Sequence, residues 1–301
     1  MRTGSTGRLR WVAVAVAACA VAATSCSSGD STDEPAASSG APAAASSGGS
    51  EAGTYLALGD SVPFGFRGAA TSEFSDEDNF VGYPELVGHE LGLDVVNASC
   101  PGETTASFLD TKAQSNGCDN SLDSGFGYRT AYPLHVLYES VDQSQLDFAV
   151  HTLTENEDVE LVTLQIGAND AFICQRTTPS RCSDPADIQA VTQTVQANLG
   201  QILSTLRGEG GYDGPIVVVT YYALDYDDAF TAATRVLDDG ILQVAEANGA
   251  AVADGYRAFE PRASQSGGDS VAAGLVLPND VHPTEDGQEL LADAVTAVVE
   301  D

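Results

Sequence analysis

Basic side chains are scarce in this 301-residue sequence, which has 12 lysines and arginines against 44 aspartates and glutamates. Lys112 is the one lysine. The formal net charge of −32 makes binding to nucleic acid unfavourable, because the phosphate backbone is itself a polyanion. The same charge disfavours electrostatic binding to anionic lipid. We therefore expect no nucleic acid among the partners of this protein.

A comfortable membrane span is also lacking, because the apolar stretch at 11–23 has only signal-peptide length and follows three arginines. Residues 23–26, Ala-Thr-Ser-Cys, resemble the site at which bacterial lipoproteins are cleaved and lipidated, although alanine replaces the usual leucine. We expect a lipoprotein-type signal peptide over 1–25 and a lipid anchor on Cys26, on the outer face of the cell membrane. Cys19 would leave a very short apolar run, and an ordinary secretory signal is the alternative.

The Ser/Gly/Ala/Pro-rich composition of residues 26–53 predicts a flexible tether, because it offers too little apolar surface for a core. The folded domain is then expected over 54–301. Its four cysteines are Cys100, Cys118, Cys174 and Cys182. An even number in an exported protein predicts disulfides, and of three possible pairings the local one, first with second and third with fourth, is the most economical. A metal site is disfavoured, since there is no Cys-x-x-Cys pair and the four histidines are scattered.

Apolar segments rich in Val, Ile, Leu and Tyr predict buried parallel strands at 54–58, 93–97, 161–166, 216–221 and 250–253. Helices are predicted between and after them, at 83–91, 144–156, 187–207, 229–248 and 284–300. This alternation predicts an α/β protein with three α/β/α layers and a central parallel sheet of about five strands. The aromatic-rich segment 110–140 is expected to line a binding site.

Polar motifs follow these strands, and the carboxyl ends of parallel strands are where ligands bind in such sheets. Ser61 lies on a sharp turn after the first strand, and its backbone N–H would hold an oxyanion if the serine capped a following helix. Gly102, Asn169 and His282 follow other strand regions. Each residue alone has an ordinary explanation as a cap, a turn or a surface loop, but together they indicate one site.

Together these motifs resemble the SGNH/GDSL hydrolases, a family named after Ser, Gly, Asn and His. The matching blocks are Gly-Asp-Ser-x-x-x-Gly at 59–65, Asn97 with Gly102, Gly-x-Asn-Asp at 167–170 and Asp-x-His-Pro at 280–283. The resemblance spans about 54–300 and implies a flavodoxin-like sheet and ester hydrolysis without metal or cofactor. It also implies that Ser61 is the nucleophile and His282 the base, with an oxyanion hole formed by Ser61, Gly102 and Asn169.

One position departs from the family pattern, which usually has its acid three residues before the histidine. Asn279 occupies that position, and Asp280 comes one residue later. Three interpretations remain open. A shifted turn brings Asp280 to His282, or Asn279 or a backbone carbonyl orients the imidazole in a Ser–His dyad, or Asp280 is merely a loop acid.

The expected function is that of a secreted, lipid-anchored esterase or lipase that acts on a small-molecule or lipid ester of a carboxylic acid. The enzymatic alternative is a carbohydrate O-acetyl esterase, since the family resembled here also serves polysaccharides. A different alternative is a non-catalytic cell-surface binding protein on a hydrolase scaffold. The presence of Ser61, Gly102, Asn169 and His282 argues against that alternative.

Overall fold

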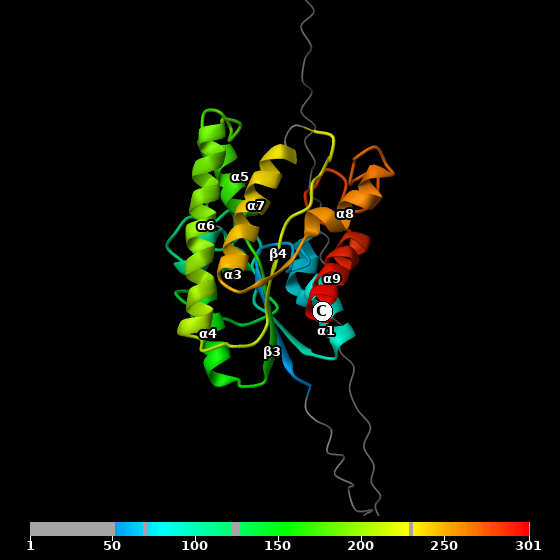
Figure 1. Cartoon of the computed structure of the whole chain (residues 1–301). Helices are drawn as coiled ribbons and strands as arrows, with labels where there is room; N and C mark the ends of the chain where they lie inside the picture. The colour runs from blue at the N-terminus through cyan, green and yellow to red at the C-terminus, as the bar shows by residue number, and fades with distance from the viewer. Residues whose placement is uncertain (1–51, 69–70, 122–126, 229–230, 301) are drawn as a thin grey trace, which may run out of the picture. The chain divides into compact units, whose positions relative to one another are not determined.

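A computed structural model of the chain describes residues 52–68, 71–121, 127–228 and 231–300 (Figure 1). The predicted signal peptide over 1–25, the lipid-modified Cys26 and almost all of the predicted tether lie outside the described residues. Among the described helices, none combines the length and the apolar character that crossing a membrane requires.

The strands form one parallel sheet, which confirms the predicted parallel sheet of about five strands, and their order in it is β2-β1-β3-β4-β5. They are β1 (Thr54–Gly59), β2 (Asp94–Asn97), β3 (Val159–Gln165), β4 (Ile216–Val219) and β5 (Ala251–Ala253). β1, which lies between β2 and β3, is apolar without alternation, and Tyr55, Leu56, Ala57 and Leu58 are fully buried. Both faces of the strand are buried because helices cover both sides of the sheet.

Helices pack on the two faces and complete the expected three layers (Figure 1). One layer holds α1 (Tyr83–Leu91), α8 (Gly255–Ser264) and α9 (Glu285–Glu300). The other holds α2 (Thr105–Leu109), α4 (Gln145–Glu155), α5 (Ala168–Thr177), α6 (Pro185–Gly208) and α7 (Thr231–Ala247). Short connections contain α3 (Tyr128–Ala131) and the 3-10 turns η1 (Thr71–Ser75) and η2 (Glu77–Asn79).

Several helix predictions need correction. α6 begins at Pro185 and not at Asp187, because the Asp184 side chain caps it and proline fits the first helical position. The sequence did not predict α5, α8 or the short helices. α5 carries the polar run Cys-Gln-Arg-Thr at 174–177, and α8 contains Pro261, so neither shows a clear apolar period.

Candidate active site

Ser61 lies just beyond the carboxyl end of β1, on a turn that the neighbouring residues hold in place. Asp60 is buried, and its Oδ1 accepts the Val62 N–H at 3.0 Å. The carbonyl of Ser61 accepts the Phe66 N–H at 2.9 Å. The possibility that Ser61 caps a helix is wrong, because residues 61–65 form only turns and Gly65 has a left-handed φ of 75°.

His282 approaches Ser61 from the loop before α9. Its Nε2 lies 2.9 Å from the Ser61 Oγ, across a separation of 221 residues. The loop is fixed by the Tyr222 hydroxyl, which donates to the carbonyl of Val281 at 2.6 Å. On one side the imidazole packs against the Phe66 ring, with 4.7 Å between the ring centroids. The serine and the imidazole are therefore already within hydrogen-bond distance.

Asp280 reaches the other ring nitrogen, with 2.6 Å between its Oδ1 and the His282 Nδ1. That hydrogen bond lowers the pKa of Asp280 to about 2. Asn279, at the position where the family usually has its acid, is exposed and has a left-handed φ of 59°. The left-handed residue turns the chain one position early, so Asp280 faces the ring. This arrangement matches the shifted-turn interpretation in its geometry.

Asn169 is the second residue of α5 and is buried, with 4% of its surface exposed. Its Nδ2 donates to Asp60 Oδ2 at 3.4 Å, and the same carboxylate oxygen accepts the Tyr221 hydroxyl at 2.6 Å. Burial raises the pKa of Asp60 to about 6. Asp60 thus links the Ser61 turn to Asn169 and to Tyr221, which follows β4. The sequence did not predict that Tyr221 contacts Asp60.

Gly102 lies in a turn after β2, the strand next to β1, with a left-handed φ of 83°. An added Cβ would lie 2.6 Å from the Gly117 backbone nitrogen, so only glycine fits here. The carbonyl of Gly102 accepts the Asn116 N–H at 2.7 Å. Gly102 does not line the cavity described below.

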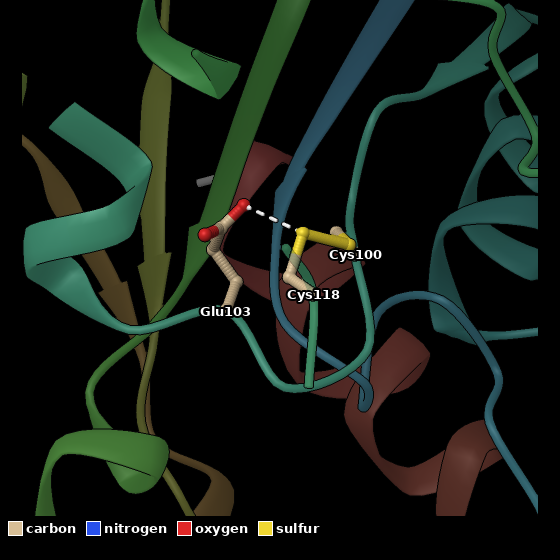
Figure 2. Close-up of side chains that lie close together, drawn as sticks. All are labelled: Cys100, Glu103 and Cys118. Carbon is tan, nitrogen blue, oxygen red and sulfur yellow. Dashed lines mark hydrogen bonds between the residues drawn. A yellow bond between two sulfur atoms is a disulfide. The ribbon is translucent and has the colours of Figure 1, made fainter. Parts of the chain in front are cut away.

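The two disulfides join Cys100 to Cys118 and Cys174 to Cys182, which confirms the local pairing. The first closes the loop that contains Gly102 and Asn116. Figure 2 shows the buried Glu103 carboxylate beside this disulfide, with its Oε2 3.3 Å from the Cys118 sulfur. Although two sulfurs and a carboxylate cluster here, both sulfurs are bonded to each other, so this group offers no thiolate to a metal.

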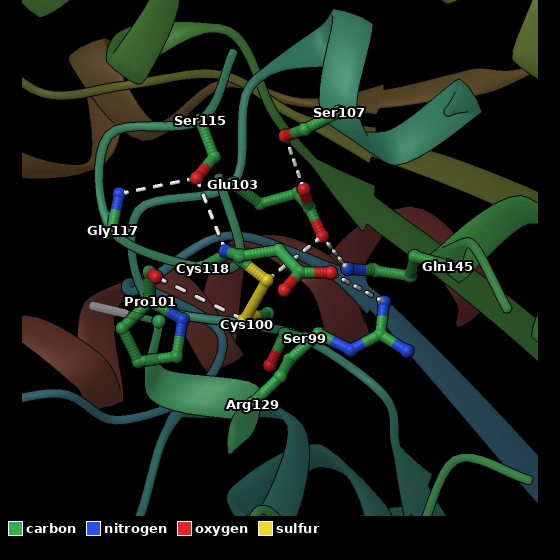
Figure 3. Close-up of a disulfide and its surroundings, with 12 residues drawn as sticks. Ser99, Cys100, Pro101, Glu103, Ser107, Ser115, Gly117, Cys118, Arg129 and Gln145 are labelled. Carbon is green, nitrogen blue, oxygen red and sulfur yellow. Dashed lines mark hydrogen bonds and ion pairs between the residues drawn. A yellow bond between two sulfur atoms is a disulfide. The ribbon is translucent and has the colours of Figure 1, made fainter. Parts of the chain in front are cut away.

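Glu103, the residue after Gly102, belongs to a polar network with Ser107 and Gln145 (Figure 3). Its carboxylate accepts hydrogen bonds from the Ser107 hydroxyl and, at 3.2 Å, from the Gln145 amide. The Gln145 oxygen in turn accepts the Gly59 N–H at 2.6 Å, just before Ser61. Burial raises the pKa of Glu103 to about 7. The network therefore ties the Gly102 turn to the end of β1.

A cavity of about 470 Å³ opens beside Ser61 and His282, at a size typical of small-molecule sites. Asn169 lines it together with side chains from α5, α6 and α7. Its apolar wall includes Phe172, Ile188, Val191, Leu224 and Leu237. The described residues of the predicted aromatic segment 110–140, which are 110–121 and 127–140, do not line this cavity. Phe172 lies on α5, which the sequence did not predict. Ile188 and Val191 lie on α6, whose predicted start at Asp187 was two residues too late.

The other histidines of the described residues lie apart from this constellation. His135 Nε2 lies 3.0 Å from the carbonyl of Phe64, and His151 lies 3.4 Å from Glu139 on the surface. His89 is exposed on α1. The structure thus brings Ser61, Asp280 and His282 together, with Asn169 beside them.

The family model for the GDSL-like lipase/acylhydrolase family matches residues 57–290. Similar solved structures include the acetylxylan esterase Axe2 from Geobacillus stearothermophilus (TM-score 0.52, 18% identity, 83% of this chain and 94% of that chain). Another is the lipase Lip_vut3 from a goat rumen metagenome (TM-score 0.53, 16% identity, 81% and 96%). A third is LAE5, an alpha/beta hydrolase enzyme from the metagenome of Lake Arreo (TM-score 0.51, 16% identity, 82% and 95%).

At these identities the structural likeness shows the fold alone, and none of the curated proteins matches the chain. The family match carries more, since it covers nearly the whole domain from β1 into α9. It includes the blocks around Ser61, Gly102, Asn169 and His282, on which the resemblance was based. This chain belongs to the GDSL-like lipase/acylhydrolase family and is an ester-hydrolysing enzyme.

Proposed function

We propose that this enzyme hydrolyses esters of apolar carboxylic acids, with Ser61 as nucleophile, His282 as base and Asp280 as the acid that orients the imidazole. The observation that carries the proposal is the hydrogen-bonded series Ser61 Oγ to His282 Nε2 at 2.9 Å and His282 Nδ1 to Asp280 Oδ1 at 2.6 Å. Such a series is the geometry in which a serine hydroxyl becomes an effective nucleophile at neutral pH.

In the first step the Ser61 Oγ bonds to the ester carbonyl carbon while its proton moves to His282 Nε2. The tetrahedral intermediate collapses when the bond to the alcohol oxygen breaks, and His282 delivers the proton to that oxygen. Water then bonds to the acyl carbon while one of its protons moves to His282 Nε2. The bond between that carbon and the Ser61 Oγ breaks, His282 returns the proton to Oγ, and the acid is released. Asp280 stays ionised throughout and stabilises the imidazolium.

The carbonyl oxygen becomes negative in both tetrahedral intermediates, and we assign its stabilisation to the Ser61 and Gly102 backbone N–H groups and the Asn169 side chain. Asn169 supports this role because it lines the cavity next to Ser61, and one of its two N–H bonds suffices for Asp60. Removal of one such donor typically costs 10²–10³-fold in kcat, about 3–4 kcal/mol.

The apolar cavity supports an extended acyl group in place of acetyl. Burial of one methylene contributes about 0.8 kcal/mol, which corresponds to roughly a fourfold rise in kcat/KM for each added methylene that is buried. We therefore expect kcat/KM on p-nitrophenyl esters to rise with acyl length from acetyl until the cavity is filled. A carbohydrate O-acetyl esterase would instead prefer acetylated xylan and show no such rise.

Two experiments test the proposal. A fluorophosphonate probe should label the wild-type enzyme and should not label Ser61→Ala, whereas an unlabelled, well-folded wild-type enzyme would refute the serine mechanism. Val191→Phe narrows the cavity and should shift the preference towards shorter acyl chains. Val236→Phe is the matched control, because Val236 is exposed on α7 and lies outside the cavity wall. An unchanged chain-length profile in Val191→Phe would contradict the assignment of the acyl site.

Export and lipidation at Cys26 belong to the same proposal. The two disulfides support an oxidising compartment, because thiols inside most bacterial cells are kept reduced. We expect radiolabelled fatty acid to be incorporated into the full chain and to be lost in Cys26→Ser. Recovery of unlabelled wild-type protein in the culture medium would instead indicate an ordinary secretory signal.

A further inference from the structure

Three side chains form a hydrogen-bonded series that ends at the proposed oxyanion site. The Arg176 guanidinium donates to Asn116 Oδ1 at 2.7 Å. Asn116 Nδ2 donates to Asn169 Oδ1 at 2.9 Å. Asn169 Nδ2 faces Asp60 at 3.4 Å and the cavity beside Ser61. Neither Asn116 nor Arg176 has a role in the mechanism described above.

The direction of this series follows from what each group is able to do. A guanidinium only donates hydrogen bonds, so the end of the Asn116 amide that meets Arg176 must be its oxygen. The NH₂ group of Asn116 then faces Asn169. Because an NH₂ group only donates hydrogen bonds, the Asn169 atom that accepts from it must be the amide oxygen. The NH₂ group of Asn169 is thereby turned towards Asp60 and the cavity. If Asn169 were flipped, its oxygen would face the negative carboxylate of Asp60 and would repel an oxyanion.

Asn116 also touches the second proposed donor. Its backbone N–H donates to the carbonyl of Gly102 at 2.7 Å, while its side chain holds Asn169. One residue therefore links the turn that carries the Gly102 N–H to the amide of Asn169. This link matters because two donors must point at the same substrate oxygen, and small misplacements of such groups are costly.

A disulfide lies two residues from Asn116 and another lies two residues from Arg176. Cys118 follows Asn116 by two residues and is bonded to Cys100, just before Gly102. Cys174 precedes Arg176 by two residues and is bonded to Cys182 at the end of the loop after α5. Arg176 lies two helical turns after Asn169 on the same helix, α5. The relative positions of Arg176 and Asn169 are thus set by a continuous helix.

We propose that Asn116 and Arg176 are positioning residues that fix the orientation of the Asn169 amide, so that its N–H points at the developing oxyanion. This inference rests on the proposed function of Asn169. Arg176 sets the direction of the Asn116 amide, and Asn116 passes that direction to Asn169. Neither residue touches the substrate.

The decisive variant is Asn116→Asp, because aspartate has the same shape and keeps an acceptor for Arg176 but has no hydrogen to donate to Asn169. We expect kcat to fall at least tenfold with KM nearly unchanged, while the melting temperature stays the same or rises. If Asn116 had only a structural role, kcat would fall only when the melting temperature also falls. Wild-type kcat in Asn116→Asp would overturn the proposal.

A double-mutant cycle tests whether Asn116 acts through Asn169. Asn116→Ala should lower kcat about tenfold in the wild-type background and less than twofold in Asn169→Ala, because the group it orients is then absent. Equal effects in both backgrounds would refute the proposal. Asn120→Ala is the matched control, since Asn120 is exposed near the same disulfide and loses only its hydrogen bond to the Lys112 carbonyl at 3.0 Å.

Arg176→Lys and Arg176→Gln complete the test. Lysine keeps a donor for Asn116 Oδ1 and should retain most of the kcat, whereas glutamine has an oxygen as well as an NH₂ group and should lose several-fold. Equal kcat in the two variants would contradict the role of Arg176. These outcomes are separate from the proposed function itself, because a Ser61→Ala enzyme that still hydrolyses esters would refute that function whatever happens at Asn116.

Discussion

Replacement of Asp280 by alanine is the most informative single perturbation of the proposed mechanism. Asp280 Oδ1 lies 2.6 Å from His282 Nδ1, and the aspartate side chain is 22% exposed. The hydrogen bond lowers the pKa of Asp280 to about 2. Since a carboxyl with a lowered pKa loses its charge only as the pH falls towards that value, Asp280 is ionised throughout any ordinary esterase assay.

An imidazolium forms beside this carboxylate when Ser61 gives up its proton. Loss of the carboxylate partner of such an imidazolium lowers kcat by about 10³–10⁴-fold in serine hydrolases, or about 4–5 kcal/mol of transition-state stabilisation. We expect Asp280→Ala to lose at least a thousandfold in kcat on a p-nitrophenyl ester, with KM changed little. Melting temperature and circular dichroism show whether the variant is folded.

The matched control is Asn279→Gly, which removes the neighbouring amide while glycine readily keeps the left-handed φ of 59°. We expect this variant to stay within about threefold of wild-type kcat. A loss of less than tenfold in Asp280→Ala would refute the triad and support a Ser–His dyad. A large loss in Asn279→Gly would show that the Asn279 side chain, at the position where the family usually has its acid, contributes to catalysis.

Other predictions address the oxyanion turn, a buried acid and a disulfide. Gly102→Ala should lower kcat by at least 10²-fold, because a Cβ would lie 2.6 Å from the Gly117 nitrogen and displace the turn. Steady-state kinetics measure the loss of kcat, and thermal melting shows whether the variant is still folded. Asp238 has one carboxylate oxygen without a hydrogen-bond partner, and burial raises its pKa to about 8. Its folded state therefore holds a proton that the unfolded state has lost, so Asp238 alone should lower the free energy of unfolding by about 1.4 kcal/mol per pH unit from near pH 4 to pH 8. Asp238→Asn should reduce the slope in urea titrations by that amount, most clearly between pH 7 and pH 8, where the buried Asp60 and Glu103 contribute least, and an unchanged slope there would contradict the assignment. Replacement of Cys100 and Cys118 together by serine should cost about 3 kcal/mol of unfolding free energy for a loop of this length.

The sequence predicts the sheet well because burial on both faces leaves an unmistakable apolar signature. All five strands are found where the apolar segments predict them, and α1 has the predicted bounds. The failures occur where local signals are weak or misleading. α5 mixes polar residues with few apolar ones, and the turn after Ser61 is ended by the left-handed Gly65, which no periodicity reveals.

The site was predictable where a residue lies within about five positions after a strand, as Ser61, Gly102 and Asn169 do. Asp280 was left open, since the sequence does not show that Asn279 adopts a left-handed φ. Asn116 lies 53 residues from the side chain that it contacts, so no spacing rule could find it. The one available signal was the nearness of Asn116 to Cys118, whose local pairing was correctly predicted.

The hydrogen bond between Ser61 and His282 joins the two ends of the folded domain, 221 residues apart. In the proposed mechanism a partly synthesised chain therefore has a serine without its base, and we expect catalytic activity only after the loop before α9 has docked. Enzymatic activity is thus a direct readout of complete folding.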